Sequence, residues 1–408
     1  MTLADRLTTQ DVAELAVGIQ QISAPTFAEY DRARAVHELL VAAGLEAELV
    51  QHADVIPNVY ARLPGEDSQL PALLISAHTD TVFPAATDLT VTRDEAAGRI
   101  AGPGIGDNSL AVAALVAVAR ALAAAGADRW RAPCDIYLVA NAGEEGLGNL
   151  GGVRAAAEHL EAAAPGGIGA AVVLEGMALG KVYHRAVGSR RYRLTVEGPG
   201  GHSWGDYGTP SAVHELIARL GPVIAMEPPA SPRTTFNVGT IAGGTSINTI
   251  AASATADVDL RSESPEELER LEETFRKAIA AGARANTSLP GVEGPGGTSP
   301  EGLSLRLELI GDRPAGAIPP DHPLVGAACA ALESAGIVPE LRSGSTDVNA
   351  LLAAGVPAVC VGVSTGGGAH RLDEFINTGP VNSGMRQLGL LIPEAALVAA
   401  GVRVVEAS

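Results

Sequence analysis

Five side chains that commonly bind metal ions lie at the ends of short apolar runs or in the loops just beyond them. The runs, at residues 73–75, 136–140, 170–174 and 358–363, have the length of buried strands. The side chains are His78, Asp107, Glu145, Glu175 and His370. Two imidazoles and three carboxylates form a donor set suited to zinc, cobalt or manganese. The sequence therefore predicts a metal centre.

The number of ligands indicates two metal ions rather than one. A catalytic metal keeps a coordination position open for water or substrate, so five protein ligands are too many for a single ion. Two ions that share a bridging carboxylate use all five ligands, and such pairs activate water for hydrolysis. We expect two divalent ions, with zinc as the first choice and cobalt or manganese as alternatives.

Each candidate has a simpler interpretation when it is taken alone. His78 and Asp80 could belong to an ordinary polar loop, and Asp107 could cap the apolar helix that follows it. Glu144 and Glu145 could both be solvated, although neighbouring carboxylates repel one another unless a positive charge lies close by. The recurrence of the pattern along the chain favours the metal centre over these alternatives.

The elements that must position these residues are those of an α/β domain. Residues 9–43 have a helical spacing that is broken at Pro25, and residues 46–50 and 58–61 have the pattern of strands. A glycine-rich loop at 102–109 leads into a long apolar helix. We expect a mixed, largely parallel sheet flanked by helices, because ligands of such sheets gather at the carboxyl ends of the strands.

A segment of different character interrupts this pattern. It contains predicted strands at 191–197, 235–242, 254–260 and 303–310, and predicted helices at 211–220 and 266–281. The order is β-α-β-β-α-β, a ferredoxin-like split βαβ sandwich. We therefore expect a catalytic, metal-binding domain in two parts, 1–188 and 312–408, and an inserted lid or dimerisation domain at 189–311. Residues 290–300, rich in Gly and Pro, are predicted to form an exposed loop.

The composition restricts the partners of the protein. The chain has 408 residues, 47% of them hydrophobic, which is enough to bury a large core in two domains. A net charge of −19 argues against nucleic acid and anionic membrane surfaces, because both repel an acidic protein. The widely spaced Cys134, Cys329 and Cys360 indicate no disulfide framework. We expect a cytoplasmic protein that acts on a small molecule or a peptide.

In their order and placement, the motifs resemble those of the dinuclear-zinc exopeptidases and deacylases. This family includes glutamate carboxypeptidase, acetylornithine deacetylase, succinyl-diaminopimelate desuccinylase, aminoacylase-1 and the tripeptide aminopeptidases. The matching motifs are Ser76-Ala77-His78-Thr79-Asp80-Thr81-Val82, Gly106-Asp107, Gly143-Glu144-Glu145, Leu174-Glu175-Gly176, Gly201-His202-Ser203, Ile247-Asn248-Thr249-Ile250, Asp259-Leu260-Arg261 and Ala369-His370. The resemblance covers most of the chain and implies a zinc-exopeptidase-like fold.

The resemblance also implies a role for each residue of the predicted centre. His78 and Glu175 would hold one metal, Glu145 and His370 would hold the other, and Asp107 would bridge the two. Asp80 would orient His78 through the imidazole nitrogen that faces away from the metal. Glu144 would be the general base that takes the proton of the attacking water.

In the inserted domain, the resemblance implies three substrate-facing residues. His202 would steady the tetrahedral oxyanion, and in this family it often comes from the other subunit of a dimer, so a homodimer is expected. Asn248 and Arg261 match positions that contact substrate, and an arginine suits a bidentate contact with a carboxylate. As alternatives, His202 could be an ordinary loop histidine and Arg261 a surface charge at a strand end.

The expected function is hydrolysis of an amide or peptide bond next to an amino acid. Among relatives, Glu at the position of Glu175 accompanies carboxypeptidases and N-acyl-amino-acid deacylases, which favours an N-acyl amino acid or a short peptide as substrate. An aminopeptidase or dipeptidase of the same family is the first alternative. A non-catalytic protein that binds a peptide or amino acid, and an acidic scaffold whose small domain only dimerises, are the others.

Overall fold

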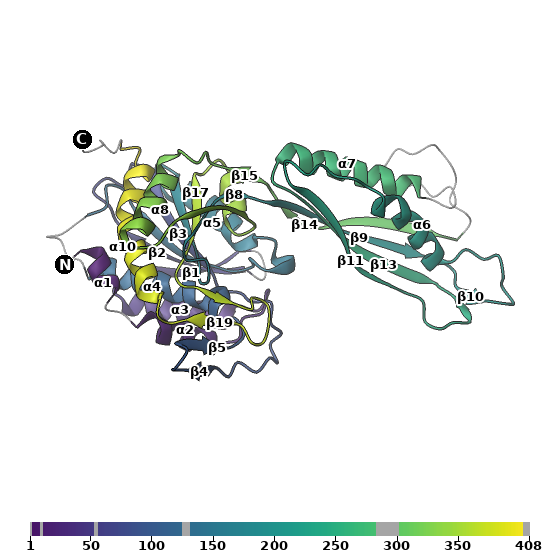
Figure 1. The fold of residues 1–408 in the computed structure, drawn as a ribbon, viewed down its shortest axis with the longest axis horizontal. Helices are drawn as coiled ribbons and strands as arrows, with labels where there is room; N and C mark the ends of the chain where they lie inside the picture. The colour runs from purple at the N-terminus through teal and green to yellow at the C-terminus, as the bar shows by residue number, and fades with distance from the viewer. Residues whose placement is uncertain (1, 9–10, 53–55, 125–130, 283–301, 403–408) are drawn as a thin grey trace. The chain divides into compact units, whose positions relative to one another are not determined.

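The computed structural model describes residues 2–8, 11–52, 56–124, 131–282 and 302–402. The chain forms two compact units: the first contains Met1–Ala186 and Ala317–Ser408, and the second contains Val187–Gly316. The second unit is coloured teal and green in Figure 1, and in the sequence it separates the two stretches of chain that form the first unit. The predicted loop at 290–300 and the start of the predicted helix at Thr9 lie outside the described residues.

The first unit is built on a mixed sheet that has nine strands among the described residues. Their order is β1 (Glu46–His52), β2 (Ile56–Leu63), β6 (Ile136–Asn141), β3 (Ala72–His78), β7 (Ile168–Glu175), β17 (Ala358–Gly362), β8 (Lys181–Ala186) and β15 (Gly316–Ala317), with β16 (Glu340–Gly344) beside β8. The four central strands β6, β3, β7 and β17 are parallel. Towards the edges the pairing is antiparallel: β1 pairs with β2, β2 with β6, and β8 with β17. The predicted largely parallel α/β sheet is confirmed.

Helices cover both faces of this sheet (Figure 1). One face packs against α1 (Leu3–Leu7), α2 (Val12–Gln20), α3 (Tyr30–Ala42), α4 (Leu110–Ala123), α8 (Pro323–Ser334) and α10 (Val381–Ala399), and the other against α5 (Gly151–Ala163) and α9 (Val348–Ala353). Successive strand residues point to opposite faces, so Leu73 and Ile75 enter one core and Leu74 enters the other. This two-sided burial explains why the strands are continuous apolar runs.

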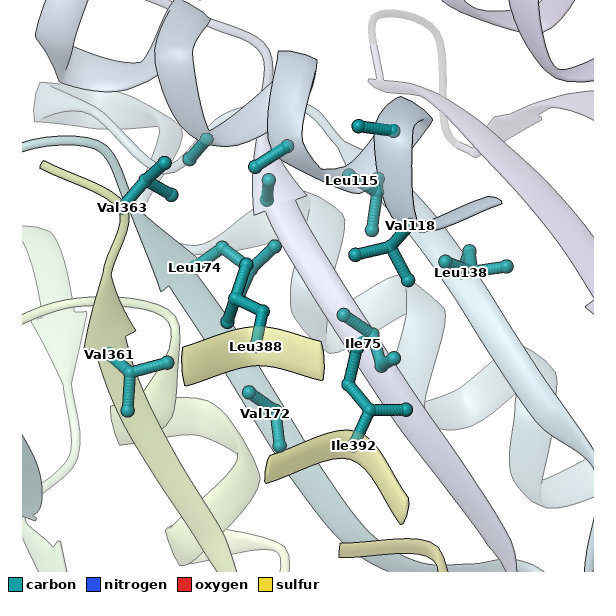
Figure 2. Close-up of a cluster of buried hydrophobic side chains, with 14 of the residues drawn as sticks. Ile75, Leu115, Val118, Leu138, Val172, Leu174, Val361, Val363, Leu388 and Ile392 are labelled. Atoms are coloured by element: carbon teal, nitrogen blue, oxygen red, sulfur yellow. The ribbon is translucent and has the colours of Figure 1, made fainter. Parts of the chain in front are cut away.

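The larger core lies between the central strands and two helices. Figure 2 shows side chains of the strands meeting those of α4 and α10; the labelled residues are Ile75, Leu115, Val118, Leu138, Val172, Leu174, Val361, Val363, Leu388 and Ile392. All of them are fully buried. Among the described helices, the stretch Ile105–Ala123 is long and apolar enough to cross a membrane, but 89% of its apolar window is buried. It therefore has the environment of a core helix.

A small antiparallel sheet lies beside the first unit's glycine-rich loop. Its strands are β18 (Gly366–Gly367), β19 (Phe375–Asn377), β5 (Arg99–Ala101) and β4 (Thr92–Asp94), in that order. The pairing of β19 with β5 joins the segment that follows His370 to the segment that precedes Asp107.

The second unit is a four-stranded antiparallel sheet with two helices packed on it. The strands, in spatial order, are β11 (Thr234–Gly243), β13 (Ser253–Ser262), β9 (Gly188–Glu197) and β14 (Ser304–Arg313). The helices are α6 (Ala212–Ile224) and α7 (Pro265–Ala281), and a short pair, β10 (Gly201–His202) with β12 (Thr249–Ile250), extends from the sheet's loops. Helix α6 continues four residues beyond its predicted end because Pro222 lies in its last turn and does not break it.

Candidate metal centre

The central strands bring the first two ligand candidates to one edge of the sheet. His78 is the last residue of β3 and Glu175 is the last residue of β7, and these two strands are parallel neighbours. Asp107 lies in a tight turn, Ile105–Ser109, directly before α4. The next residue, Asn108, bonds to both sides of Glu175: its amide donates to the carbonyl oxygen of Leu174 at 3.0 Å and accepts from the N–H of Gly176 at 2.9 Å. The turn is therefore fixed to the end of β7.

Three of these side chains form one cluster of potential metal ligands, His78, Asp107 and Glu175. The Nε2 atom of His78 lies 3.2 Å from Oδ1 of Asp107 and 3.9 Å from Oε1 of Glu175. The imidazole is almost completely buried. One ring nitrogen thus faces two carboxylates, which is the arrangement that a shared cation requires.

A second cluster contains Asp107, Glu145 and His370. The Nε2 atom of His370 lies 3.1 Å from Oε1 of Glu145 and 3.3 Å from Oδ2 of Asp107. His370 comes from the loop between β18 and β19, and Glu145 follows β6. The two clusters overlap in Asp107 alone, whose two oxygens face different histidines.

Asp80 connects the first cluster to the loop that carries Glu144 and Glu145. Its Oδ1 lies 3.4 Å from Nδ1 of His78 and accepts a hydrogen bond from the backbone N–H of Glu144 at 2.9 Å. Its Oδ2 accepts from the backbone N–H of Glu145 at 2.8 Å and from the hydroxyl of Thr26 at 2.9 Å. Asp80 is fully buried. This carboxylate therefore orients a histidine and two loop residues together.

In the protein without metal ions, the crowded ionisable groups of the centre have strongly shifted pKa values. Burial raises the pKa of Glu175 to about 8, with a further rise from the carboxylate of Asp107 and an opposing effect of His78. Hydrogen bonds to Asp107 and Glu145 raise the pKa of His370 to about 10. Burial acts to raise the pKa of Asp107, but its hydrogen bonds with His370 and His78 outweigh this and hold the pKa well below its usual value.

These shifts are those of a site that attracts cations. The carboxylates retain excess protons or draw them onto the imidazoles because several negative groups share a small, mostly buried volume. A divalent ion at each cluster would supply positive charge in place of those protons, and nitrogen with carboxylate oxygen is a donor set for zinc, cobalt or manganese. The residues present therefore fit two divalent metal ions.

The predicted residues of the second unit lie in two places. His202 and Asn248 are neighbours, because β10 pairs with β12 and the N–H of Ser203 donates to the carbonyl oxygen of Asn248 at 3.0 Å. Arg261 lies on β13, where its Nε donates to Oδ2 of Asp259 at 2.6 Å. The seven remaining candidates belong to the first unit; they are His78, Asp80, Asp107, Glu144, Glu145, Glu175 and His370.

Two buried carboxylates close to the centre were not found from the sequence. Oε1 of Glu29, a residue between α2 and α3, accepts from the N–H of Gly143 at 3.1 Å. Burial, followed by the charge of Asp80, raises the pKa of Glu29 to about 7. Oε1 of Glu374 accepts from the N–H groups of Gly106 and Asp107. Neither glutamate has a local sequence signal, since each bonds to a loop more than a hundred residues away.

Fold and site together define a class of protein. An α/β sheet with two adjoining histidine and carboxylate clusters at the carboxyl ends of its strands is the framework of a metal-dependent hydrolase with two divalent ions. The chain belongs to peptidase family M20/M25/M40, whose sequence profile matches residues 74–392. The resemblance noted in the sequence is thereby confirmed, and the chain is a metal-dependent hydrolase.

Solved structures share this fold over nearly the whole chain. Aminopeptidase PepT from Bacillus cereus is 18% identical with a TM-score of 0.71, and the match covers 96% of this chain and 99% of that one. The M20 family metallo-carboxypeptidase Sso-CP2 from Sulfolobus solfataricus is 14% identical with a TM-score of 0.73, covering 95% and 100%. The YXEP protein of Bacillus subtilis, described as a dinuclear metal-binding peptidase, is 15% identical with a TM-score of 0.64, covering 98% and 100%. Curated protein sequences give no match.

Proposed function

We propose that the protein hydrolyses an amide or peptide bond next to an amino acid, using two divalent ions bound at the overlapping clusters. The observation that carries this proposal is the position of Asp107, whose Oδ1 faces His78 at 3.2 Å and whose Oδ2 faces His370 at 3.3 Å. A carboxylate that directs its two oxygens to different histidines is placed to bridge two ions. The solved structures named above are less than one fifth identical to this chain in sequence. They support the fold, and the substrate must be tested by experiment.

In this proposal, each ion has its own pair of ligands beside the shared Asp107. His78 and Glu175 hold one ion, and Glu145 and His370 hold the other; zinc is the first choice and cobalt or manganese are alternatives. Such ions would supply positive charge that lowers the pKa of a bound water and polarises the scissile carbonyl. Asp80 keeps His78 in the tautomer and orientation that present Nε2 to the site.

Glu144 is the proposed general base. Its backbone N–H is fixed by the hydrogen bond to Asp80, and its negative charge lies close enough to His78 to raise the pKa of that imidazole. Because its neighbour Glu145 is the proposed ligand, the two adjacent glutamates have separate roles. Glu144 takes a proton from the attacking water and delivers it to the leaving amine.

His202 is the proposed donor to the oxyanion. Its Nδ1 accepts hydrogen bonds from the backbone N–H groups of Trp204 and Gly205, both at 3.2 Å. A nitrogen that accepts two such bonds carries no proton, so the neutral ring has its proton on Nε2 and can donate it. The hydroxyl of Ser246 donates to Oδ1 of the neighbouring Asn248 at 2.9 Å, so this oxygen already has a donor, and the amide N–H groups of Asn248 are the proposed donors to substrate.

The proposed substrate is an N-acyl amino acid or the C-terminal residue of a short peptide. Glutamate rather than aspartate at position 175 supports this choice, and Arg261, 40% exposed in its side chain, is a candidate partner for the substrate carboxylate. The second candidate is an aminopeptidase or dipeptidase activity, which the similarity to an aminopeptidase supports. Because aminopeptidase and carboxypeptidase structures match almost equally well, substrates must decide between the two.

The test is a substrate panel with the zinc- or cobalt-loaded protein. The panel contains N-acetyl and longer N-acyl amino acids, N-blocked dipeptides, and free dipeptides and tripeptides, each with a chelator control. Chelator-sensitive cleavage of the N-blocked compounds is the expected result. Cleavage of free-amine peptides alone would favour the second candidate, and no cleavage in the whole panel would favour a binding protein.

We further propose a cytoplasmic homodimer that assembles through the second unit. Among the described residues, strand β11 lies at an edge of its sheet, and Ile241 on it is 59% exposed, so the strand offers an edge and apolar surface to a second copy. Sedimentation of the wild type and of Ile241→Lys tests this assembly. We expect a dimer for the wild type and a larger monomer fraction for the variant; a monomeric wild type would rule the dimer out.

A further inference from the structure

Glu374 is a buried carboxylate that bonds to the backbone of the predicted bridging residue. It lies between His370 and strand β19 and is completely buried. Its Oε1 accepts hydrogen bonds from the N–H of Gly106 at 2.7 Å and from the N–H of Asp107 at 2.8 Å. Its Oε2 has no hydrogen-bond partner among the described residues. Burying a carboxylate in this way is unfavourable, so the two bonds to the turn must serve the structure or the site.

The same residue closes the loop that carries His370. The N–H of Glu374 donates to the carbonyl oxygen of Arg371 at 3.1 Å, and the N–H of Arg371 donates to that of Gly368 at 2.9 Å. Within this loop His370 has a φ of 66°, a left-handed conformation that is unfavourable for residues with a side chain and persists only where neighbouring contacts enforce it. The turn that Glu374 completes provides such contacts.

Glu374 therefore joins two ligand loops that are remote in the sequence. Its backbone belongs to the His370 loop and its side chain holds Asp107, 267 residues away. A second connection runs in parallel, since the N–H of Gly102 donates to the carbonyl oxygen of Glu374 at 2.8 Å. By contrast, His78 and Glu175 are terminal residues of neighbouring sheet strands, and the sheet itself fixes their separation.

We propose that Glu374 is a positioning residue that sets the distance between Asp107 and His370 and thereby maintains the ion site formed by Asp107, Glu145 and His370. This inference rests on the proposed function, because it uses the ligand assignment given there. Loss of the Oε1 acceptor removes the side-chain bonds between the Asp107 turn and the His370 loop and leaves the backbone bond of Gly102 and the pairing of β19 with β5, so the site that depends on both loops weakens. The site of His78 and Glu175 keeps its strand-borne ligands and is affected less.

Four variants of the full chain separate positioning from charge and from general instability. Glu374→Ala removes the acceptor, and Glu374→Gln removes the charge but keeps an oxygen that can accept from both N–H groups. Glu374→Asp keeps the charge but shortens the side chain by one methylene. Asp373→Ala is the matched control, because Asp373 is the adjacent acid, its side chain is 68% exposed, and it forms an ion pair with the equally exposed Arg371. Thermal unfolding of each metal-free protein, followed by circular dichroism, reports whether the variant folds.

The measurement is zinc binding to the chelator-stripped proteins by titration calorimetry, with bound metal counted by mass spectrometry after dialysis. We expect two ions for the wild type, Asp373→Ala and Glu374→Gln. Glu374→Ala should retain one ion and bind the second about 10- to 100-fold more weakly, the range found when a residue supporting a metal ligand is lost, and Glu374→Asp should fall between. If Glu374→Ala does not fold, the zinc affinities of Glu374→Asp and Glu374→Gln are compared instead.

Two results would overturn the inference while leaving the proposed function intact. One is a Glu374→Ala or Glu374→Asp protein that binds two ions with wild-type affinity. The other is a Glu374→Gln protein as impaired as Glu374→Ala, because the charge and not the acceptor would then be responsible. A wild-type protein that binds fewer than two ions would instead refute the two-ion assignment itself, so the two failures are distinguishable in the same experiment.

Discussion

The backbone N–H of Glu144 donates a hydrogen bond to Oδ1 of Asp80 at 2.9 Å. The same oxygen lies 3.4 Å from Nδ1 of His78, which also contacts the backbone carbonyl oxygen of Asp80 at 3.2 Å, so one buried residue fixes both a predicted metal ligand and the predicted general base. The relative position of ligand and base is therefore set by Asp80 and does not depend on the exposed surface of the loop.

Replacement of Glu144 by Gln should stop the reaction and leave the metal centre intact. The amide cannot accept the proton of the attacking water, and loss of a general base lowers kcat by about 10²- to 10⁴-fold. Metal content should remain at two ions, because the ligand is Glu145. Steady-state kinetics and metal analysis of the variant check both statements, with Glu161→Gln on the exposed surface of α5 as the control. A Glu144→Gln enzyme with wild-type kcat would remove Glu144 as the base.

Replacement of Asp80 by Asn should weaken both metal binding and catalysis. An asparagine has one acceptor oxygen in place of two, so it cannot receive the N–H groups of Glu144 and Glu145 on separate oxygens as Asp80 does. Loss of such support for a histidine ligand reduces metal affinity about 10- to 100-fold. Calorimetric zinc titration measures this loss. Thr26→Ala deletes only the hydroxyl bond to Oδ2 at 2.9 Å and should have a smaller effect; equal effects of the two variants would contradict the prediction.

Removal of the metal ions should destabilise the folded chain. The three carboxylates and two histidines of the centre come from strand ends and loops throughout the first unit, so bound ions link these segments and bind the folded state preferentially. A ligand at 100 times its dissociation constant stabilises by about 2.7 kcal/mol. Differential scanning calorimetry with and without a chelator should show a lower Tm without metal, restored when zinc is added back. An unchanged Tm would mean that the ions contribute nothing to stability.

The general arrangement of the centre could be predicted from the sequence, because sheet geometry determines where the ends of the strands lie. Parallel strands deliver their carboxyl ends to one edge, so polar residues after separate apolar runs, such as His78 and Glu175, must come close together. The apolar runs also predict the central sheet, since strands buried on both faces are continuously apolar. Both expectations use only local patterns and one rule of topology.

The supporting contacts could not be predicted in the same way. Glu374 bonds to a turn 267 residues earlier, Glu29 to a loop 114 residues later, and Asn108 to a strand end 66 residues later. Each is a single polar residue whose neighbours in the sequence carry no periodic or spacing signal. Its role depends on which loops the fold brings together, and that information is present only in the three-dimensional structure.

The core between the sheet and α10 should be sensitive to loss of volume. Ile392 is fully buried among strand and helix side chains (Figure 2), and replacing it with Ala should lower the free energy of unfolding by about 2–5 kcal/mol because of lost burial and the cavity left behind. Val338→Ala, at a residue 87% exposed, should change it by less than about 0.5 kcal/mol. Urea denaturation compares the two, and equal effects would show that the cluster is not a tightly packed core.

The second unit should lose a specific stabilising contact at low pH. The carboxylate of Glu272 on α7 accepts hydrogen bonds from Tyr192, Arg190 and Arg276, the last at 2.9 Å. Burial acts to raise the pKa of Glu272, but the bonds from Tyr192 and Arg276 and the charge of Arg190 outweigh it, so the folded-state pKa lies below the ordinary value of 4.5. A depressed carboxylate pKa stabilises the folded state above the unfolded-state pKa, and this stabilisation disappears as the pH falls through the folded-state pKa.

Glu272→Gln should therefore destabilise the chain in a pH-dependent way. At pH 7 we expect a loss of about 1.5–3 kcal/mol in the free energy of unfolding, the contribution of a hydrogen-bonded charged group, and a much smaller loss once the wild-type carboxylate is protonated. Urea denaturation of the chelator-stripped proteins at several pH values from 7 downward measures the difference. Glu273→Gln is the control, because the side chain of Glu273 is 69% exposed and forms an ion pair with Lys277 at 3.6 Å. A loss for Glu272→Gln that stays constant down to the lowest pH would show that packing, and not the charge of Glu272, is responsible.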